Sequence, residues 1–154
     1  MSLHDLRCIG MTRNKNLPAV LLGVAIAIIL WMTILSREKQ IEVNTVYQPF
    51  HALVSFLKEI QRGRIGTNFL GNIILFIPFG FLLPCVTDWN RMWKTVVTGL
   101  GFSLVIETIQ LITSRGCFDF DDVILNGLGC VIGYGINRAA RKLFTKGSLN
   151  TSGI

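Results

Sequence analysis

The stretch "FDFDDVILNGLGCVIGYG", residues 118–135, combines two features that rarely occur together. Three carboxylates, Asp119, Asp121 and Asp122, precede an apolar segment that is spaced by glycines, and Asn126 lies one turn further in. Acidic clusters normally need water, whereas apolar segments with regularly spaced glycines suit lipid and close contacts between helices. The stretch therefore predicts a membrane helix with acids at its entrance.

The composition favours a membrane protein. Of the 154 residues, 51% are hydrophobic and only 16% are charged, and the mean hydropathy is +0.53. Soluble domains carry about 25% charged residues. The net charge of +6 comes from basic residues that flank the apolar runs, as in membrane proteins with positive cytoplasmic loops. We expect no nucleic-acid binding, because no basic patch is interleaved with aromatic residues.

The apolar runs predict four membrane spans. A spanning helix needs about 20 mostly apolar residues. The runs at 16–36 and 65–87 are uncharged, and the run at 95–114 carries one charge, Glu107. The run at 123–137 would be only about 22 Å long as a helix, so it spans the membrane when extended at both ends.

The predicted fold class is an all-α membrane protein: a bundle of about four transmembrane helices plus a short outer interfacial helix. We expect a single domain, with a kink near Pro78, where the proline ring removes a backbone hydrogen bond. The predicted spans are approximately 16–36, 66–86, 94–114 and 119–141, the interfacial helix covers approximately 48–61, and the tail at 147–154 is expected to be disordered.

The distribution of basic residues predicts the orientation. With four spans the two termini share one side, and more of the 15 Lys and Arg residues fall on that side than on the other. Positive loops stay inside. We therefore expect a multi-pass protein of the cell membrane with both termini cytoplasmic, which places the acids in the outer leaflet.

Polar side chains from three spans meet in this outer leaflet. Glu107 and Gln110 are three residues apart and share a helix face. Asp119, Asp122 and Asn126 share a face of the last span by the same spacing. Intramembrane acids cost about 2.5–3.5 kcal/mol each on insertion scales and usually face the interior of a bundle. Together with Asn72 of the second span, these residues predict an outer-leaflet polar site.

The face that carries Asn126 continues through Gly129 and Gly133. A Gly-x-x-x-Gly pair lets another helix approach closely, because no side chain separates the two backbones. The face is thus polar at its outer end and suited to tight packing further in. Asp121 is expected to point elsewhere, toward headgroups or water.

Several roles for the polar site stay open at this level. Asn and Gln can join helices, and an Asp near a helix start can cap it. Converging carboxylates and amides can also hold a divalent cation or the headgroup of a lipid. Arg115, on the short outer turn, can pair with an acid or with a phosphate.

Catalytic signals are sparse. The two histidines, His4 and His51, both fall outside the polar site, and the four cysteines are dispersed without metal-ligand spacing. We predict no catalytic residues, no metal ligands and no cofactor, and we lean against an enzyme.

Three ordered motifs resemble the VanZ-like membrane protein family: "GNIILFIPFGFLLP" at 71–84, "IETIQ" at 106–110 and "FDFDDVILNGLGCVIGYG" at 118–135. The resemblance implies roles for the positions that match the family motif: Asn72, Pro78, Gly80, Glu107, Gln110, Asp119, Asp122, Asn126, Gly129 and Gly133. Arg115 lies one residue further from the first aspartate than is common in the family.

The resemblance also implies a phenotype, because the naming member of the family is associated with resistance to teicoplanin, a glycopeptide antibiotic with a lipid tail. The first functional hypothesis is therefore a membrane protein whose polar site binds a membrane lipid or a lipid-tailed ligand. One alternative is a membrane enzyme acting on a lipid-linked envelope precursor, with Glu107, Asp119 and Asp122 as its reactive groups. The other is a structural partner subunit.

Overall fold

The computed structural model describes residues 16–35, 54, 57–58, 67–87, 89, 91–115 and 118–151. Within these residues the chain is helical and contains no strand. The elements are α1 (Asn16–Leu30), continued by a π-helical segment η3 (Trp31–Leu35), then α3 (Thr67–Thr87), α4 (Met92–Ile112) and α5 (Phe120–Thr151). The predicted class, an all-α membrane bundle, is confirmed.

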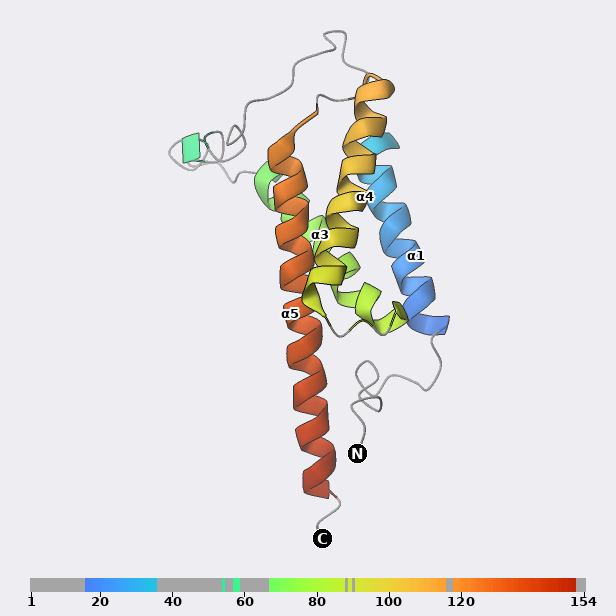
Figure 1. Ribbon diagram of the computed structural model, residues 1–154, viewed down its shortest axis with the longest axis vertical. Helices are drawn as coiled ribbons and strands as arrows, with labels where there is room; N and C mark the ends of the chain where they lie inside the picture. Colours follow the sequence, from blue (N-terminus) through green and yellow to red (C-terminus); the bar gives the residue numbers. More distant parts are fainter. Residues whose placement is uncertain are drawn as a thin grey trace.

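Three of the helical segments are long and apolar enough to cross a membrane: Asn16–Leu35, Phe69–Thr87 and Met92–Ile112. The fourth predicted span, α5, is not among them, since Asp121 and Asp122 at its start and Arg138 and Arg141 further on interrupt its apolar run. Instead, α5 is recognised by its place in the bundle. It packs along α3 over its upper part and also contacts α4 (Figure 1).

The helix α5 is longer than predicted. It continues to Thr151, past the predicted end of the membrane span near 141 and into the tail that was expected to be disordered. The segment after Asn137 is rich in Ala, Arg, Lys and Leu and has no proline, and these residues favour helix in water as well as in a membrane. Residues 152–154 lie outside the described residues, as does the predicted interfacial helix at 48–61 except for Val54, Leu57 and Lys58.

The arrangement of the helices in Figure 1 defines two ends of the bundle. At the lower end lie the start of α1, the start of α4 and the protruding end of α5; at the upper end α4 finishes and α5 begins. The first and last described helices thus point their outer ends the same way, as an even number of spans requires. The helix α3 is continuous through Pro78 and Pro84, and the kink near Pro78 stays a prediction.

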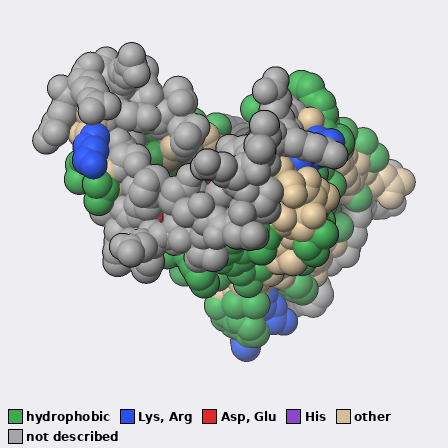
Figure 2. All heavy atoms as spheres, turned by 90° about the horizontal axis from the view of Figure 1, so that it is seen from above, with side chains coloured by type: hydrophobic (Ala, Val, Ile, Leu, Met, Phe, Trp, Pro, Cys, Tyr) green, Lys and Arg blue, Asp and Glu red, His purple; other side chains and the backbone are tan. Residues whose placement is uncertain are grey.

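The helices meet around a core of aromatic rings. The centroids of Phe79 and Phe102 lie 5.4 Å apart, and Phe76 lies 6.0 Å from each of them. Ile29 of α1 and Ile106 of α4 are 1% exposed against this cluster. Exposed hydrophobic side chains occur on every long helix, and Figure 2 shows such side chains among the parts of the surface that are not grey; an exposed apolar surface suits lipid.

Glycines let α5 approach α3 closely. A Cβ atom built on Gly129 would meet the carbonyl oxygen of Ile73, and one built on Gly133 would meet the carbonyl oxygen of Ile77. Gly80 of α3 is equally tight against the backbone of Cys130. The close approach predicted from the Gly-x-x-x-Gly spacing is therefore made, and its partner is α3.

The orientation of this bundle is open to a direct test. With both termini cytoplasmic, a cysteine introduced at exposed Thr113 at the upper end should react with a membrane-impermeant maleimide in intact cells. A cysteine at exposed Leu143, on the protruding end of α5, should react only after lysis. Labelling is measured as the increase over the unsubstituted protein, which already has four cysteines. The reverse pattern would contradict the orientation.

Candidate functional site

The upper end of the bundle holds the predicted polar residues, and Glu107 ties two helices together there. Glu107 is 2% exposed, and its Oε2 atom accepts a hydrogen bond from the backbone N–H of Asp119 at 3.1 Å. The first N–H groups of a helix have no acceptor within the helix, and the N–H groups of the residues just before the helix have none there either. The Glu107 carboxylate therefore fixes the start of α5 against α4.

Asp119 caps α5. Its Oδ1 atom accepts a hydrogen bond at 2.9 Å from the backbone N–H of Asp121, the second residue of α5. Asp and Asn are preferred at this position because they satisfy a free backbone donor, and the negative charge suits the positive end of the helix dipole. The capping role that the sequence left open for Asp119 is therefore present.

Asp122 is half-buried and Asp121 is buried. Half-buried Asp122 accepts a hydrogen bond from Nδ2 of Asn72, which joins α5 to α3. Asp121 is only 6% exposed, so the expectation that it points toward headgroups or water is wrong. The reason is its register, because Asp121 lies one turn before Leu125, which is also 6% exposed, on a buried face of α5 that is widened by contacts with both α3 and α4.

Asn126 makes a contact one turn further into the bundle. Its Nδ2 atom donates to Oγ of Ser103 at 2.7 Å, and the two residues are 3% and 0% exposed. Ser103 was missed by the sequence reasoning. A signal was available, since Ser103, Glu107 and Gln110 follow the spacing of four and three residues that defines one helix face.

Gln110 and Arg115 bind the end of the first span instead of the acids. The Nε2 atom of Gln110, 1% exposed, donates to the carbonyl oxygen of Thr33 at 2.7 Å. One guanidinium nitrogen of Arg115 donates to the carbonyl oxygens of Ile34 at 3.1 Å and Leu35 at 3.2 Å. Carbonyl groups at a helix end lack intrahelical partners and attract cations.

The turn after α4 places Arg115 for this role. Ser114 has a positive φ of 55°, and the N–H of Arg115 donates to the carbonyl of Gln110 at 3.0 Å. The N–H of Ser114 donates to the carbonyl of Leu111 at 3.3 Å, which completes a Schellman motif. The acid or phosphate that the sequence suggested as a partner of Arg115 is thus replaced by main-chain carbonyls.

Two buried acceptor atoms at this end have no hydrogen-bond partner: Oε1 of Gln110 and Oδ1 of Asn126. Buried polar atoms are normally paired, and each one left without a partner costs about 1–3 kcal/mol. Both residues already use their amide nitrogen to join helices. Their oxygens are therefore acceptors that the hydrogen bonds between the helices leave unused.

The acids do not form a metal centre within the described part of the chain, where no group of three or more His, Cys, Asp or Glu side chains is placed to hold an ion. Asp119 and Asp122 are directed to a backbone N–H and to Asn72, respectively.

One buried amide of α5 lies toward the lower end of the bundle. Asn137 is 2% exposed, donates to the carbonyl oxygen of Phe81 at 2.8 Å and lies 3.1 Å from Sγ of Cys85. It was not predicted, although the steps from Asn126 through Gly133 to Asn137 keep it on the same face. Asn137 joins α5 to α3 without contributing to the upper site.

These observations define a multi-pass α-helical membrane protein with a cross-linked polar cluster at one end. The chain belongs to the VanZ/LLP1 family, whose sequence model matches residues 19–141. It is 29% identical to protein VanZ of Enterococcus faecium over 134 residues, which covers 80% of this chain and 77% of that protein. No solved structure matches the chain significantly.

Proposed function

We propose that this protein binds the polar head of an amphiphile at the upper end of its bundle and thereby reduces susceptibility to lipid-tailed glycopeptides such as teicoplanin. The observation that carries the proposal is the pair of buried, unpartnered acceptors, Oε1 of Gln110 and Oδ1 of Asn126. A head rich in hydroxyl or amino groups supplies the donors that these oxygens lack.

The surroundings of the two acceptors suit such a head. Asp119, Asp122 and Asn72 are half-buried, so part of each side chain is exposed. Their oxygens attract hydroxyl and ammonium groups, and hydrogen bonds to a charged acceptor are roughly twice as strong as neutral ones. The apolar flank of the helices accommodates an acyl tail in the same leaflet. A lipid-tailed ligand thus has a place for each of its two parts.

A structural role is the second candidate, and the hydrogen bonds favour it. Polar contacts between helices at this end include Glu107 to Asp119, Asn72 to Asp122, Ser103 to Asn126 and Gln110 to Thr33. Interhelical hydrogen bonds in membranes contribute about 0.6 kcal/mol each on average. The two candidates differ in whether the residues affect binding apart from stability.

Purified protein in lipid nanodiscs should bind teicoplanin saturably and should not bind a glycopeptide that lacks the lipid tail. Asn126→Ala should abolish this binding, because it removes an acceptor of the head. The matched control is Asn137→Ala, which removes a buried, hydrogen-bonded amide from the same helix, about three turns further along and away from the upper end. Both variants should lose similar stability, about 0.5–1.5 kcal/mol.

The comparison separates the candidates. Loss of binding in Asn126→Ala alone supports a ligand site, and equal loss in both variants would show that stability controls the effect. Chemical conversion of an added lipid-linked envelope precursor by the purified protein would favour the membrane enzyme instead. Susceptibility of the expression host to teicoplanin, measured at matched protein levels, links binding to the phenotype.

A further inference from the structure

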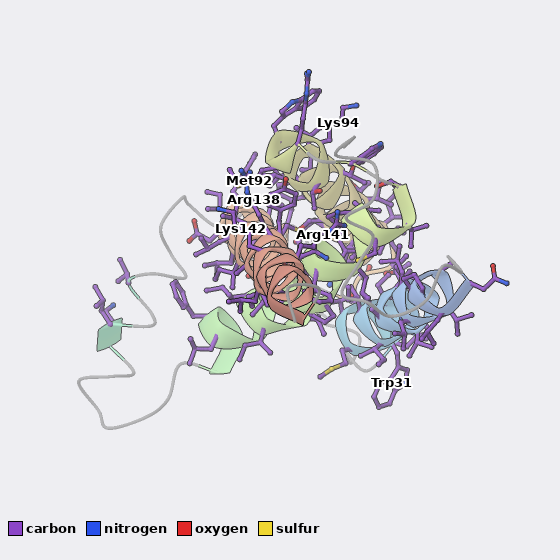
Figure 3. The ribbon with its side chains drawn as sticks, turned by 90° about the horizontal axis from the view of Figure 1, so that it is seen from below. Trp31, Met92, Lys94, Arg138, Arg141 and Lys142 are labelled. Carbon is purple, nitrogen blue, oxygen red and sulfur yellow. The ribbon has the colours of Figure 1, made fainter. Side chains whose placement is uncertain are left out.

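The lower end of the bundle carries a surface of a different kind. We call it the basic end, defined by Arg91, Lys94, Arg138, Arg141 and Lys142. Arg91, Arg138 and Lys142 are exposed, whereas Lys94 and Arg141 are half-buried. Figure 3, a view from below, shows Lys94 at the start of α4 and Arg138, Arg141 and Lys142 on α5.

The packing of α4 against α5 places these cations at one level. The two helices run in opposite directions, and the side chain of Cys130 sits against Gly99. Seven residues below Gly99 on α4 is Met92, and seven residues below Cys130 on α5 is Asn137. Arg138 therefore lies near the level of the first turn of α4, and Lys142 lies about one turn below it.

Little negative charge balances the basic end. No Asp or Glu follows Asp122 in the sequence, and between Glu59 and Glu107 there is a single acid, Asp88, which lies outside the described residues. The first turn of α4 contains Lys94 and no acid. A cation there is unfavourable, because the start of a helix already carries about half a positive charge. Within the described residues, the lower part of α4 and the part of α5 after Asp122 therefore hold no acid that could balance Lys94, Arg138 and Lys142.

Two tryptophans indicate that the basic end lies at a membrane surface. The Nζ atom of Lys94 lies 5.7 Å from the ring centroid of Trp89 and 5.9 Å from that of Trp93. Tryptophan is enriched at the level of lipid headgroups, and its ring attracts a cation held over its face. Trp93 is 57% exposed, so it is available to lipid.

The length of α5 also indicates that the basic end lies at the membrane surface. Its 32 residues extend about 48 Å, whereas the hydrocarbon core of a bilayer is about 30 Å thick. With Asp121 and Asp122 at one boundary, the helix leaves the core near Arg138 and Arg141. Basic side chains therefore lie where phosphate groups of the surrounding leaflet lie.

We propose that the basic end binds the headgroups of anionic phospholipids in the leaflet that surrounds it. Arg138 and Lys94 contact the phosphodiester, Arg by paired hydrogen bonds and Lys as a point charge. Lys142 and Arg141 add attraction just outside the core. If these basic residues only determine the orientation of the protein in the membrane, they need to be positive but should not bind one lipid selectively.

The test uses full-length protein in detergent, titrated with dioctanoyl phosphatidylglycerol and with dioctanoyl phosphatidylcholine, and read by native mass spectrometry. Phosphatidylglycerol should bind selectively. The variant Lys94→Gln/Arg138→Gln/Lys142→Gln should weaken that binding about 100-fold, since each cation near a headgroup contributes roughly five-fold. The matched variant Lys94→Arg/Arg138→Lys/Lys142→Arg keeps the charges and should retain the preference for the anionic lipid.

Other outcomes overturn the proposal. These are equal binding of the two lipids, an unchanged preference in the folded Gln variant, and binding of inorganic phosphate as tight as that of phosphatidylglycerol, which would indicate a site for a soluble anion. If the Gln variant fails to fold, the salt dependence of the parent decides. Raising salt from about 0.1 M to about 1 M shortens the screening length from about 10 Å to about 3 Å and should remove the preference. A preference that survives would contradict a headgroup held by charge.

Discussion

Replacing Gly133 by Ala should destabilise the bundle, whereas the same change at Gly135, two residues along α5, should not. A Cβ atom at Gly133 would lie 2.8 Å from the backbone nitrogen of Phe81, 3.0 Å from the carbonyl carbon of Gly80 and closer still to the carbonyl oxygen of Ile77. These are backbone atoms of α3, so the whole helix has to move. Overpacking of this kind costs about 1–3 kcal/mol.

Gly135 provides the matched control. It is exposed, and a Cβ atom built there meets nothing within 4 Å. Ala is more favourable than Gly in a helix by about 1 kcal/mol, so Gly135→Ala should leave the melting temperature unchanged or raise it. Thermal unfolding of both variants in the same detergent measures the difference. Equal melting temperatures would mean that this face of α5 does not press against α3.

The glycine spacing shows what a sequence can predict about such a contact. The interval between Gly129 and Gly133 defines a face of one helix and predicts that a backbone lies against it. It does not say which helix, because the partner contributes main-chain atoms that every residue has. Ile73 and Ile77 meet the two glycines through their backbone carbonyl oxygens. Because their side chains are not involved, their residue type does not indicate the contact.

The polar site, too, could be predicted only in part. The shared faces of Glu107 with Gln110 and of Asp122 with Asn126 follow from helical spacing, and the structure places all four at one end of the bundle. The partner of Arg115 could not be predicted, since backbone carbonyls attract a cation regardless of residue type.

Asp121 was misplaced for another reason. Burial on α5 extends over a wide face because the helix contacts both α3 and α4. A single stripe of polar residues marks only part of that face. The end of α5 lies beyond the predicted end of the span because charge marks where a helix leaves the membrane, whereas helix propensity decides where the helix itself ends.

Glu107→Gln and Asp122→Asn should leave the fold intact and abolish binding of a lipid-tailed glycopeptide. Each substitution keeps an oxygen where the hydrogen bond is accepted, from the N–H of Asp119 or from Nδ2 of Asn72. Only the charge is lost. The melting temperature should therefore stay close to that of the parent, whereas Glu107→Leu leaves the N–H of Asp119 without its acceptor and should cost about 1–3 kcal/mol.

A reciprocal exchange sharpens the test. The double variant Asn72→Asp/Asp122→Asn keeps one carboxylate and one amide in contact and moves the charge from α5 to α3. If the site needs a negative charge at the upper end, the exchange should recover part of the binding that Asp122→Asn loses. Binding in nanodiscs and susceptibility of the host to teicoplanin are measured on the same variants, at matched expression and with melting temperatures recorded.

The cost of the charges is what makes these substitutions decisive. A carboxylate in the middle of a membrane helix costs about 2.5–3.5 kcal/mol on insertion scales. Gln at Glu107 and Asn at Asp122 would make the two hydrogen bonds described here and insert more easily. If the carboxylates serve only to join helices, the neutral variants should therefore be as stable as the parent and confer the same susceptibility at equal abundance. Loss of binding from variants of unchanged stability would instead assign the negative charge to a ligand.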